Sequence, residues 1–138
     1  MRILVMGLSG AGKTTLATEL NKALIGSRLL NADVLREQFN DWDFSYTGRL
    51  RQAARMTRIA THSRDKFIIA DFIAPLAVQR EMFGADVTIW MDTVQSCQYE
   101  DTNSMFEPPT SWTMRITDHH KGNVLTALSI IEGINGRV

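Results

Sequence analysis

The stretch Gly7-Leu8-Ser9-Gly10-Ala11-Gly12-Lys13-Thr14 decides the fold class of this chain. It fills every fixed position of the phosphate-binding loop, or P-loop, motif GxxxxGK[ST]. The apolar run 2–6 before it has the composition of a short buried strand, and 16–20 after it reads as a helix. In that context the glycines let backbone N–H groups surround a polyphosphate at the positive end of the helix. The sequence therefore predicts that the chain binds a nucleoside triphosphate.

Two side chains of this loop have specific expected roles. Lys13 would reach the β- and γ-phosphates, and the hydroxyl of Thr14 would be a ligand of Mg²⁺. Lys13 is therefore also a predicted catalytic residue, because it would neutralise the charge that develops during phosphoryl transfer. The predicted nucleotide-binding residues are Gly7, Leu8, Ser9, Gly10, Ala11, Gly12, Lys13, Thr14 and Thr15.

The composition is that of a soluble globular protein with a single domain spanning residues 1–138. Fifteen basic and fifteen acidic residues cancel, so no overall field attracts the chain to nucleic acid or membrane. The single cysteine, Cys97, cannot form an internal disulfide, which agrees with a reducing cytoplasm. No apolar run has transmembrane length, and the first residues read as a strand rather than a signal peptide. We expect a cytoplasmic protein without a membrane partner.

Apolar runs and turn residues alternate regularly along the chain. Expected strands cover 2–6, 27–30, 66–71, 87–91 and 114–117, and expected helices begin near 16 and cover 33–39, 47–63, 76–83 and 123–131. We expect residues 100–113 to be irregular because Pro108 and Pro109 exclude helix. This order predicts an α/β fold of three layers, α/β/α, with a mostly parallel five-stranded sheet of the P-loop kinase type. Ligands of such sheets bind beyond the carboxyl ends of the strands.

Two aspartates follow expected strands at that edge of the sheet. Asp33 lies three residues before Arg36 on a helical turn, so a carboxylate that takes a hydroxyl proton could lie beside a guanidinium that holds an anion. The alternative is that Asp33 only caps its helix, and we favour the functional reading from its position. Asp71 ends the most hydrophobic strand, where a Walker B carboxylate would hold Mg²⁺. A capping or turn role for Asp71 is equally compatible with the sequence.

Four arginines occur close together on the expected helix 47–63. Arg51, Arg55 and Arg58 follow the spacing i, i+4, i+7 and form one basic stripe, while Arg49 lies outside it. Such a stripe is usually a solvated face, and we expect one or two of the four to contact ligand. The three histidines show no ligand-like spacing, and we expect them to be structural or surface residues.

Beyond the P-loop, three further segments make the chain resemble the adenylyl-sulfate kinase (APS kinase) family. The resemblance runs in order from Met1 to about Asp101. The matching segments are Gly7–Thr14, Asp33…Arg36, Phe44-Ser45…Arg49 and Phe72-Ile73-Ala74-Pro75. Because many kinases share the P-loop, the three later segments carry the specificity of the resemblance.

The resemblance implies a reaction and its residues. In sulfate assimilation the γ-phosphoryl group of ATP, with Mg²⁺, would pass to the 3′-hydroxyl of adenosine 5′-phosphosulfate. Asp33 matches the family aspartate near that hydroxyl and is our candidate base or orienting group. Arg36 and Arg49 match the arginines that hold the phosphosulfate, and the resemblance also suggests a homodimer. Further substrate-pocket positions are Phe44, Gln52 and Ile73.

The chain departs from the family in the acceptor region. Asn31 replaces the first aspartate of the family's Asp-Gly-Asp segment, and Gly48 replaces the aspartate before the second arginine. The segment 97–106 lacks the lid lysine, and Glu100 stands in place of the lid arginine, so the chain is a short form with a divergent lid. Losing one charged contact to phosphate costs about 1.5–3 kcal/mol. The sequence thus indicates an altered acceptor pocket.

Two other functions stay open at this point. The first is a P-loop kinase that acts on a nucleoside, nucleotide or nucleic-acid hydroxyl, and only under this alternative would nucleic acid be a partner. The arginine stripe motivates it, because a basic face can follow a phosphate backbone. The second is a non-catalytic nucleotide-binding module, which the altered lid motivates.

Overall fold

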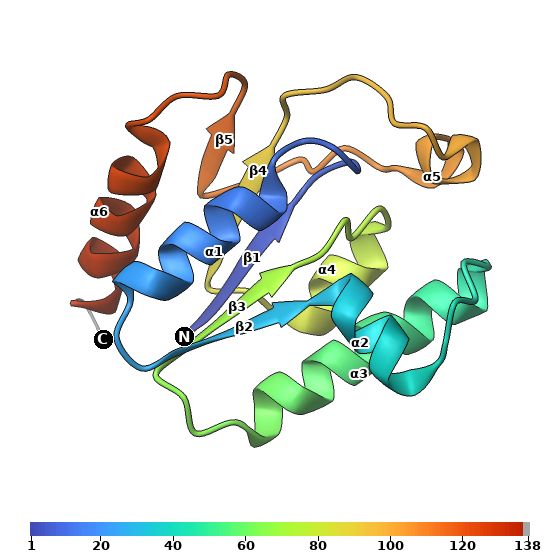
Figure 1. Cartoon of the computed structure of the whole chain (residues 1–138), viewed down its shortest axis with the longest axis horizontal. Coiled ribbons are helices and arrows are strands. Elements are labelled where there is room, and N and C mark those ends of the chain that lie inside the picture. The colour runs from blue at the N-terminus through green and yellow to red at the C-terminus, as the bar shows by residue number, and fades with distance from the viewer. Residues whose placement is uncertain (137–138) are drawn as a thin grey trace.

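Five parallel strands form the centre of the computed structural model, which describes residues 1–136 (Figure 1). Their order in the sheet is β2-β3-β1-β4-β5, so the first strand of the chain lies in the middle. The strands are β1 (Arg2–Met6), β2 (Ser27–Asn31), β3 (Phe67–Asp71), β4 (Val87–Met91) and β5 (Met114–Ile116). The expected parallel five-stranded sheet is confirmed.

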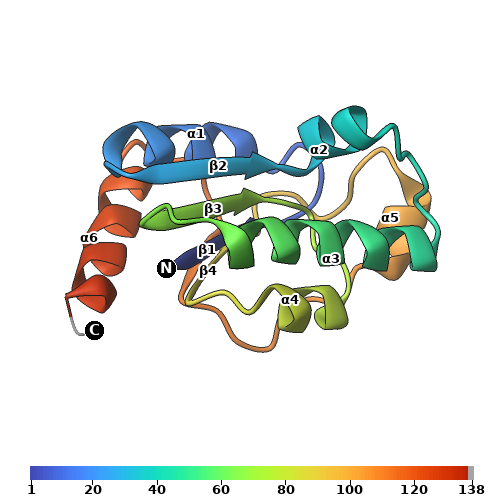
Figure 2. The same cartoon turned by 90° about the horizontal axis from the view of Figure 1, so that it is seen from below.

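Helices cover both faces of this sheet. The main helices are α1 (Lys13–Ala23), α3 (Tyr46–His62), α4 (Ala77–Phe83) and α6 (Asn123–Asn135). Helices α1 and α6 pack on one face, and α3 and α4 pack on the other, with the sheet between them (Figure 2). The predicted three-layer α/β/α arrangement is therefore confirmed.

The side chains of β1 alternate between the two faces of the sheet, and both faces are covered, which explains why its sequence reads as one apolar run. Ile3 and Val5 contribute to the core beneath α1 and α6, whereas Leu4 and Met6 contribute to the core beneath α3 and α4. All four side chains are buried, because a parallel strand in the middle of such a sheet meets water on neither face. Among residues 1–136, none of the helices is both long and apolar enough to cross a membrane.

Two short helices complete the fold. Helix α2 (Ala32–Phe39) begins directly after β2, and Asn31 is its N-cap, because its side chain accepts a hydrogen bond of 3.0 Å from the backbone N–H of Val34. The cap is thus Asn31, and not Asp33.

Helix α5 (Glu100–Met105) contradicts our expectation of an irregular segment over 100–113. The prolines disfavour helix only near themselves, and α5 ends before Pro108. Glu100 and Asp101 in its first turn also favour a helix start, because their carboxylates face the positive end of the helix dipole.

Candidate active site

The P-loop joins the carboxyl end of β1 to α1 in a conformation that requires glycine at two positions. Gly7 has φ 145°, and a Cβ there would lie 2.5 Å from the carbonyl oxygen of Met91 on the neighbouring strand. Gly12 has φ 95°, and a Cβ there would lie 2.8 Å from Cε1 of His119. Close approach by β4 and by the segment after β5 therefore fixes the course of the loop.

Lys13 lies largely buried at the start of α1, with its Nζ donating a hydrogen bond of 3.0 Å to the carbonyl oxygen of Leu8. Burial lowers the pKa of Lys13, and the nearby carboxylates of Asp71 and Asp33 act in the opposite direction. A buried ammonium that retains few protein partners is suited to an incoming phosphate.

Thr14, Asp71 and Asn31 meet beside this lysine. The Thr14 hydroxyl donates to Oδ2 of Asp71 over 2.6 Å, and Nδ2 of Asn31 donates to the same oxygen over 2.7 Å. No group of three or more His, Cys, Asp or Glu side chains within residues 1–136 could hold a metal by itself. One carboxylate with one hydroxyl nevertheless fits Mg²⁺, which completes its shell with water and substrate phosphates.

Two pockets open at this edge of the sheet and meet each other. The first, which we call the P-loop pocket, has a volume of about 130 Å³ and is lined by Lys13, Thr14 and Asp71 among others. The second, which we call the aromatic pocket, has a volume of about 380 Å³. Three residues line both pockets: Ser9, Asp33 and Ile73. Asp33 is exposed and stands where the two spaces join.

The aromatic pocket takes its name from Trp42, Phe44 and Tyr99, which line it and are each about half exposed. Its charged lining consists of Arg49 with the carboxylates of Asp33 and Asp101. The ring centroids of Trp42 and Phe44 lie 6.4 Å apart at 46°, within the range of favourable aromatic contact. This lining suits a molecule that has a flat ring and a polar group.

Two predicted substrate residues are buried behind this pocket and do not line it. Nη1 of Arg36 donates to the carbonyl oxygens of Asp41 (3.0 Å) and Asp43 (3.2 Å), and its Cζ lies 4.3 Å from the centroid of the Phe44 ring. Nε2 of Gln52 donates to the carbonyl oxygen of Ala32 over 2.8 Å. These contacts hold the loop 40–45 and α2 in place, and direct contact of either residue with substrate stays a prediction.

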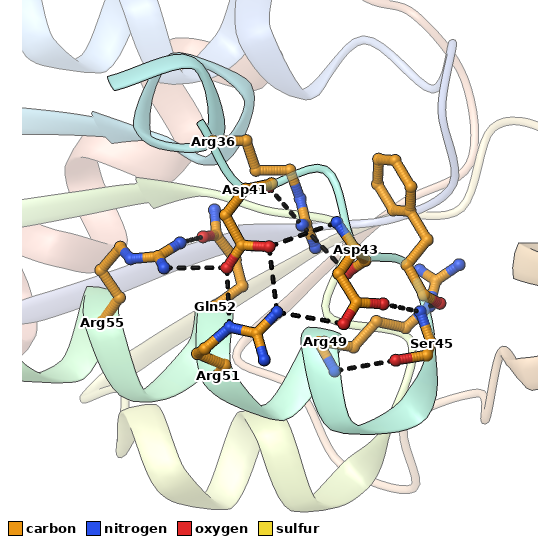
Figure 3. Close-up of polar contacts among 10 residues, drawn as sticks. Arg36, Asp41, Asp43, Ser45, Arg49, Arg51, Gln52 and Arg55 are labelled. Carbon is orange, nitrogen blue, oxygen red and sulfur yellow. Dashed lines mark hydrogen bonds and ion pairs between the residues drawn. The ribbon is translucent and has the colours of Figure 1, made fainter. Parts of the chain in front are cut away.

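Two arginines of the α3 stripe, Arg51 and Arg55, face an acidic loop (Figure 3). Arg51 donates from Nε to Asp41 over 2.7 Å and from Nη2 to Asp43 over 3.1 Å, and Arg55 donates to Asp41 over 2.9 Å. Hydrogen bonds from Arg51 and Arg55 hold the pKa of Asp41 well below its usual range. Because two of its three charges are paired, the stripe gives little support to a nucleic-acid partner.

A third pocket, which we call the flank pocket, lies on the other side of the P-loop. It has a volume of about 390 Å³, and its walls come from the start of α1 and from the segment 119–124 after β5. His119, His120 and Thr15 are among its lining residues. No pattern in the sequence places these histidines near the P-loop, because the contact depends on β5 lying next to β4.

The structure thus brings most of the predicted site residues together. Lys13, Thr14 and Asp71 share the P-loop pocket, while Phe44 and Arg49 reach the aromatic pocket. Sequence reasoning missed several lining residues: Trp42, Tyr99, Asp101, Thr102 and the segment 119–124. For Trp42 the sequence did contain a signal. This aromatic residue lies two positions before Phe44 in a short polar loop, where no core is available to bury it.

Comparisons with known proteins identify the family and the fold. A family profile described as Adenylylsulphate kinase matches residues 1–110. Comparison with curated proteins gave no match.

Among solved structures, the fold is similar to that of the Mycobacterium tuberculosis APS kinase CysC in complex with AMPPNP and APS. The TM-score is 0.80 at 23% identity, covering 95% of this chain and 96% of that one. A gluconokinase from Sinorhizobium meliloti has a TM-score of 0.69 at 14% identity, with coverages of 99% and 94%. A shikimate kinase from Acinetobacter baumannii in complex with shikimate has a TM-score of 0.65 at 17% identity, with coverages of 99% and 93%. At these identities the likeness establishes the fold alone.

Proposed function

This chain belongs to the adenylylsulphate kinase family, a family of P-loop kinases, and from that premise we propose that it transfers the γ-phosphoryl group of ATP to the 3′-hydroxyl of adenosine 5′-phosphosulfate. The mycobacterial enzyme of similar fold was solved with an ATP analogue and with APS, which supports both substrates of the proposal.

The observation that carries the proposal is the junction of the P-loop pocket and the aromatic pocket. Ser9, Asp33 and Ile73 line both, so a phosphate on the P-loop and a hydroxyl in the aromatic pocket would face each other across Asp33. Holding two reactants in contact makes transfer effectively unimolecular, which is the main contribution of phosphoryl-transfer enzymes.

In the proposed reaction, four residues that line the P-loop pocket have tasks: Asp33, Lys13, Thr14 and Asp71. The oxygen of the acceptor hydroxyl bonds to the γ-phosphorus, the bond from that phosphorus to the β–γ bridging oxygen breaks, and the carboxylate of Asp33 receives the hydroxyl proton. Lys13 donates hydrogen bonds to the phosphate oxygens as charge moves to the leaving group. Thr14 and Asp71 would hold Mg²⁺, which supplies further neutralisation of the β- and γ-oxygens when bound.

The aromatic lining supports a nucleoside acceptor over a sugar or shikimate. Trp42, Phe44 and Tyr99 offer flat apolar surface, and base–aromatic stacking is worth about 1–3 kcal/mol per base. Acceptors without a ring system would leave these half-exposed side chains uncovered.

A second candidate is a kinase that acts on the hydroxyl of a nucleoside or of another nucleotide. It is favoured by the charge of the aromatic pocket, where Arg49 is accompanied by two carboxylates, Asp33 and Asp101. The two carboxylates beside Arg49 weaken the binding of a negatively charged phosphosulfate. They leave the binding of an uncharged nucleoside unaffected.

The test is a transfer assay with γ-labelled ATP and Mg²⁺ against a panel of acceptors. The panel contains adenosine 5′-phosphosulfate, AMP, adenosine, other nucleosides, short oligonucleotides, gluconate and shikimate. The proposal expects labelled product with adenosine 5′-phosphosulfate at the highest kcat/KM. Preference for a nucleoside would select the second candidate. If ATP binds and no acceptor becomes labelled, the result would favour a non-catalytic nucleotide-binding module.

A further inference from the structure

The guanidinium of Arg49 is fixed in the wall of the aromatic pocket. Arg49 is only 4% exposed, and its Nε donates a hydrogen bond of 2.8 Å to the carbonyl oxygen of Phe44. Its Nη2 donates to Oγ1 of Thr102 over 3.1 Å and lies 3.4 Å from Oδ2 of Asp101. An anion bound in the aromatic pocket would therefore meet a guanidinium that already has the carboxylate of Asp101 beside it.

The two partners of this ion pair differ greatly in exposure. The side chain of Asp101 is 63% exposed, against 4% for Arg49. Arg49 is buried and bonded to Phe44 and Thr102, which holds its guanidinium in place, whereas Asp101 can turn into solvent at low cost because an exposed carboxylate keeps its hydration. An anion that enters the pocket therefore displaces Asp101 from Arg49, and not the reverse.

Helix α5 carries Asp101 and is held to α3 by Thr102, which is 3% exposed and accepts a hydrogen bond from Arg49. The side chain of Asn103 also folds back on the segment before the helix and bonds to both backbone polar groups of Cys97, at 2.9 Å each. Beyond its end, the backbone N–H of Glu107 donates to the carbonyl oxygen of Pro75 over 2.7 Å. The bonds of Thr102 to Arg49 and of Glu107 to Pro75 do not involve Asp101, so α5 keeps its place when the Asp101 side chain turns away, and the carboxylate stays near the pocket that it lines.

We propose that Asp101 is a specificity-determining residue that sets how much negative charge the aromatic pocket accepts, because its carboxylate lies against the guanidinium that would bind an anionic acceptor there. This inference rests on the proposed function in one respect: the aromatic pocket takes the acceptor. Removing the carboxylate should strengthen binding of anionic nucleotides and leave an uncharged nucleoside unaffected, since like charges at close range oppose binding.

The experiment measures binding without ATP, so that it does not depend on transfer. Isothermal titration calorimetry gives the Kd of adenosine, AMP and adenosine 5′-phosphosulfate for the native chain, Asp101→Asn and Asp101→Ser. The matched control is Glu37→Gln, which removes one negative charge at an exposed position of α2 that does not line the pocket. We expect both Asp101 variants to bind the two anionic nucleotides about tenfold more tightly, with adenosine unchanged and Glu37→Gln close to native.

Any of these results would overturn the inference: equal gains in the Asp101 and Glu37 variants, an equal gain for adenosine, or no binding of AMP by the Asp101 variants. Transfer is assayed separately. A charge-selective gain in binding without any phosphorylated acceptor would refute the proposed kinase activity and leave the role of Asp101 intact. Normal transfer without a charge-selective gain in binding would refute the role of Asp101 and leave the proposed kinase activity intact.

Discussion

Replacing Gln79 by leucine tests how the fold holds the acceptor side of the site. Gln79 lies on α4, is 1% exposed, and joins α4 to α3 through its amide. Its Nε2 donates to the carbonyl oxygen of Arg49 over 2.9 Å, and its Oε1 accepts from the backbone N–H of Leu76 over 3.0 Å. Leucine has a similar size and can make neither bond.

The expected cost follows from what each group loses. Leu76 is buried and precedes the first turn of α4, so its N–H has no helical partner, and leaving it unpaired costs about 1–3 kcal/mol. The carbonyl of Arg49 lies inside α3 and keeps its hydrogen bond within the helix. Losing the additional bond from Gln79 therefore costs less, about 0.5–1.5 kcal/mol. We expect Gln79→Leu to lower the free energy of unfolding by about 2–4 kcal/mol, a large share of the roughly 5–15 kcal/mol of a typical domain.

Urea unfolding followed by tryptophan fluorescence measures this difference, with Gln38→Leu on the exposed face of α2 as the control. We expect the midpoint of Gln79→Leu to fall without a change in the m-value, and the free energy of unfolding of Gln38→Leu to stay within about 0.5 kcal/mol of native. A Gln79→Leu protein as stable as the control would refute the reasoning, because the buried N–H would then have found another partner.

Three further predictions concern the site and its acidic loop. Lys13→Met should lower kcat/KM by at least about 10²-fold while circular dichroism shows an unchanged fold; near-normal turnover would contradict its assignment. Asp33→Asn should lower kcat by about 10²–10⁴-fold and leave the Kd of ATP unchanged, and a selective rise in the Kd would instead indicate a nucleotide-binding role. The depressed pKa of Asp41, caused by Arg51 and Arg55, contributes stability above its ordinary value of 3.8 that is lost as the pH falls below it. Native protein should therefore lose stability more steeply than Asp41→Asn between about pH 4 and pH 2, and parallel acid-unfolding curves would rule this out.

Much of the fold follows from local patterns in the chain. Continuous apolar runs such as 87–91 identify buried parallel strands, and the observed bounds of β4 are those predicted. Helix α5 was missed because the sequence shows two prolines nearby but not where the chain turns toward Arg49. Short helices depend on such tertiary contacts more than on their own propensity.

The same distinction between local patterns and tertiary contacts applies to the residues of the site. Residues of the P-loop are predictable because one continuous segment makes the phosphate contacts. Arg36 and Gln52 illustrate the limit, since their residue types suit ligand binding while their polar atoms bond to the backbone at 41–43 and at Ala32. Whether a buried polar side chain serves a ligand or the fold depends on distances that composition and spacing do not contain.

The central position of β1 also determines when this protein becomes able to bind nucleotide. Of the elements in this sheet, the strand and loop of the phosphate site are synthesised first, yet within the described residues β1 pairs with β3 and β4, and Thr14 bonds to Asp71 across 57 residues of chain. Pairings of such long range form late, because the closure entropy of the intervening chain opposes them. An emerging chain therefore carries an unformed P-loop until residue 91 has left the ribosome. Once formed, bound nucleotide stabilises the whole sheet, because only the assembled β3-β1-β4 centre can bind it.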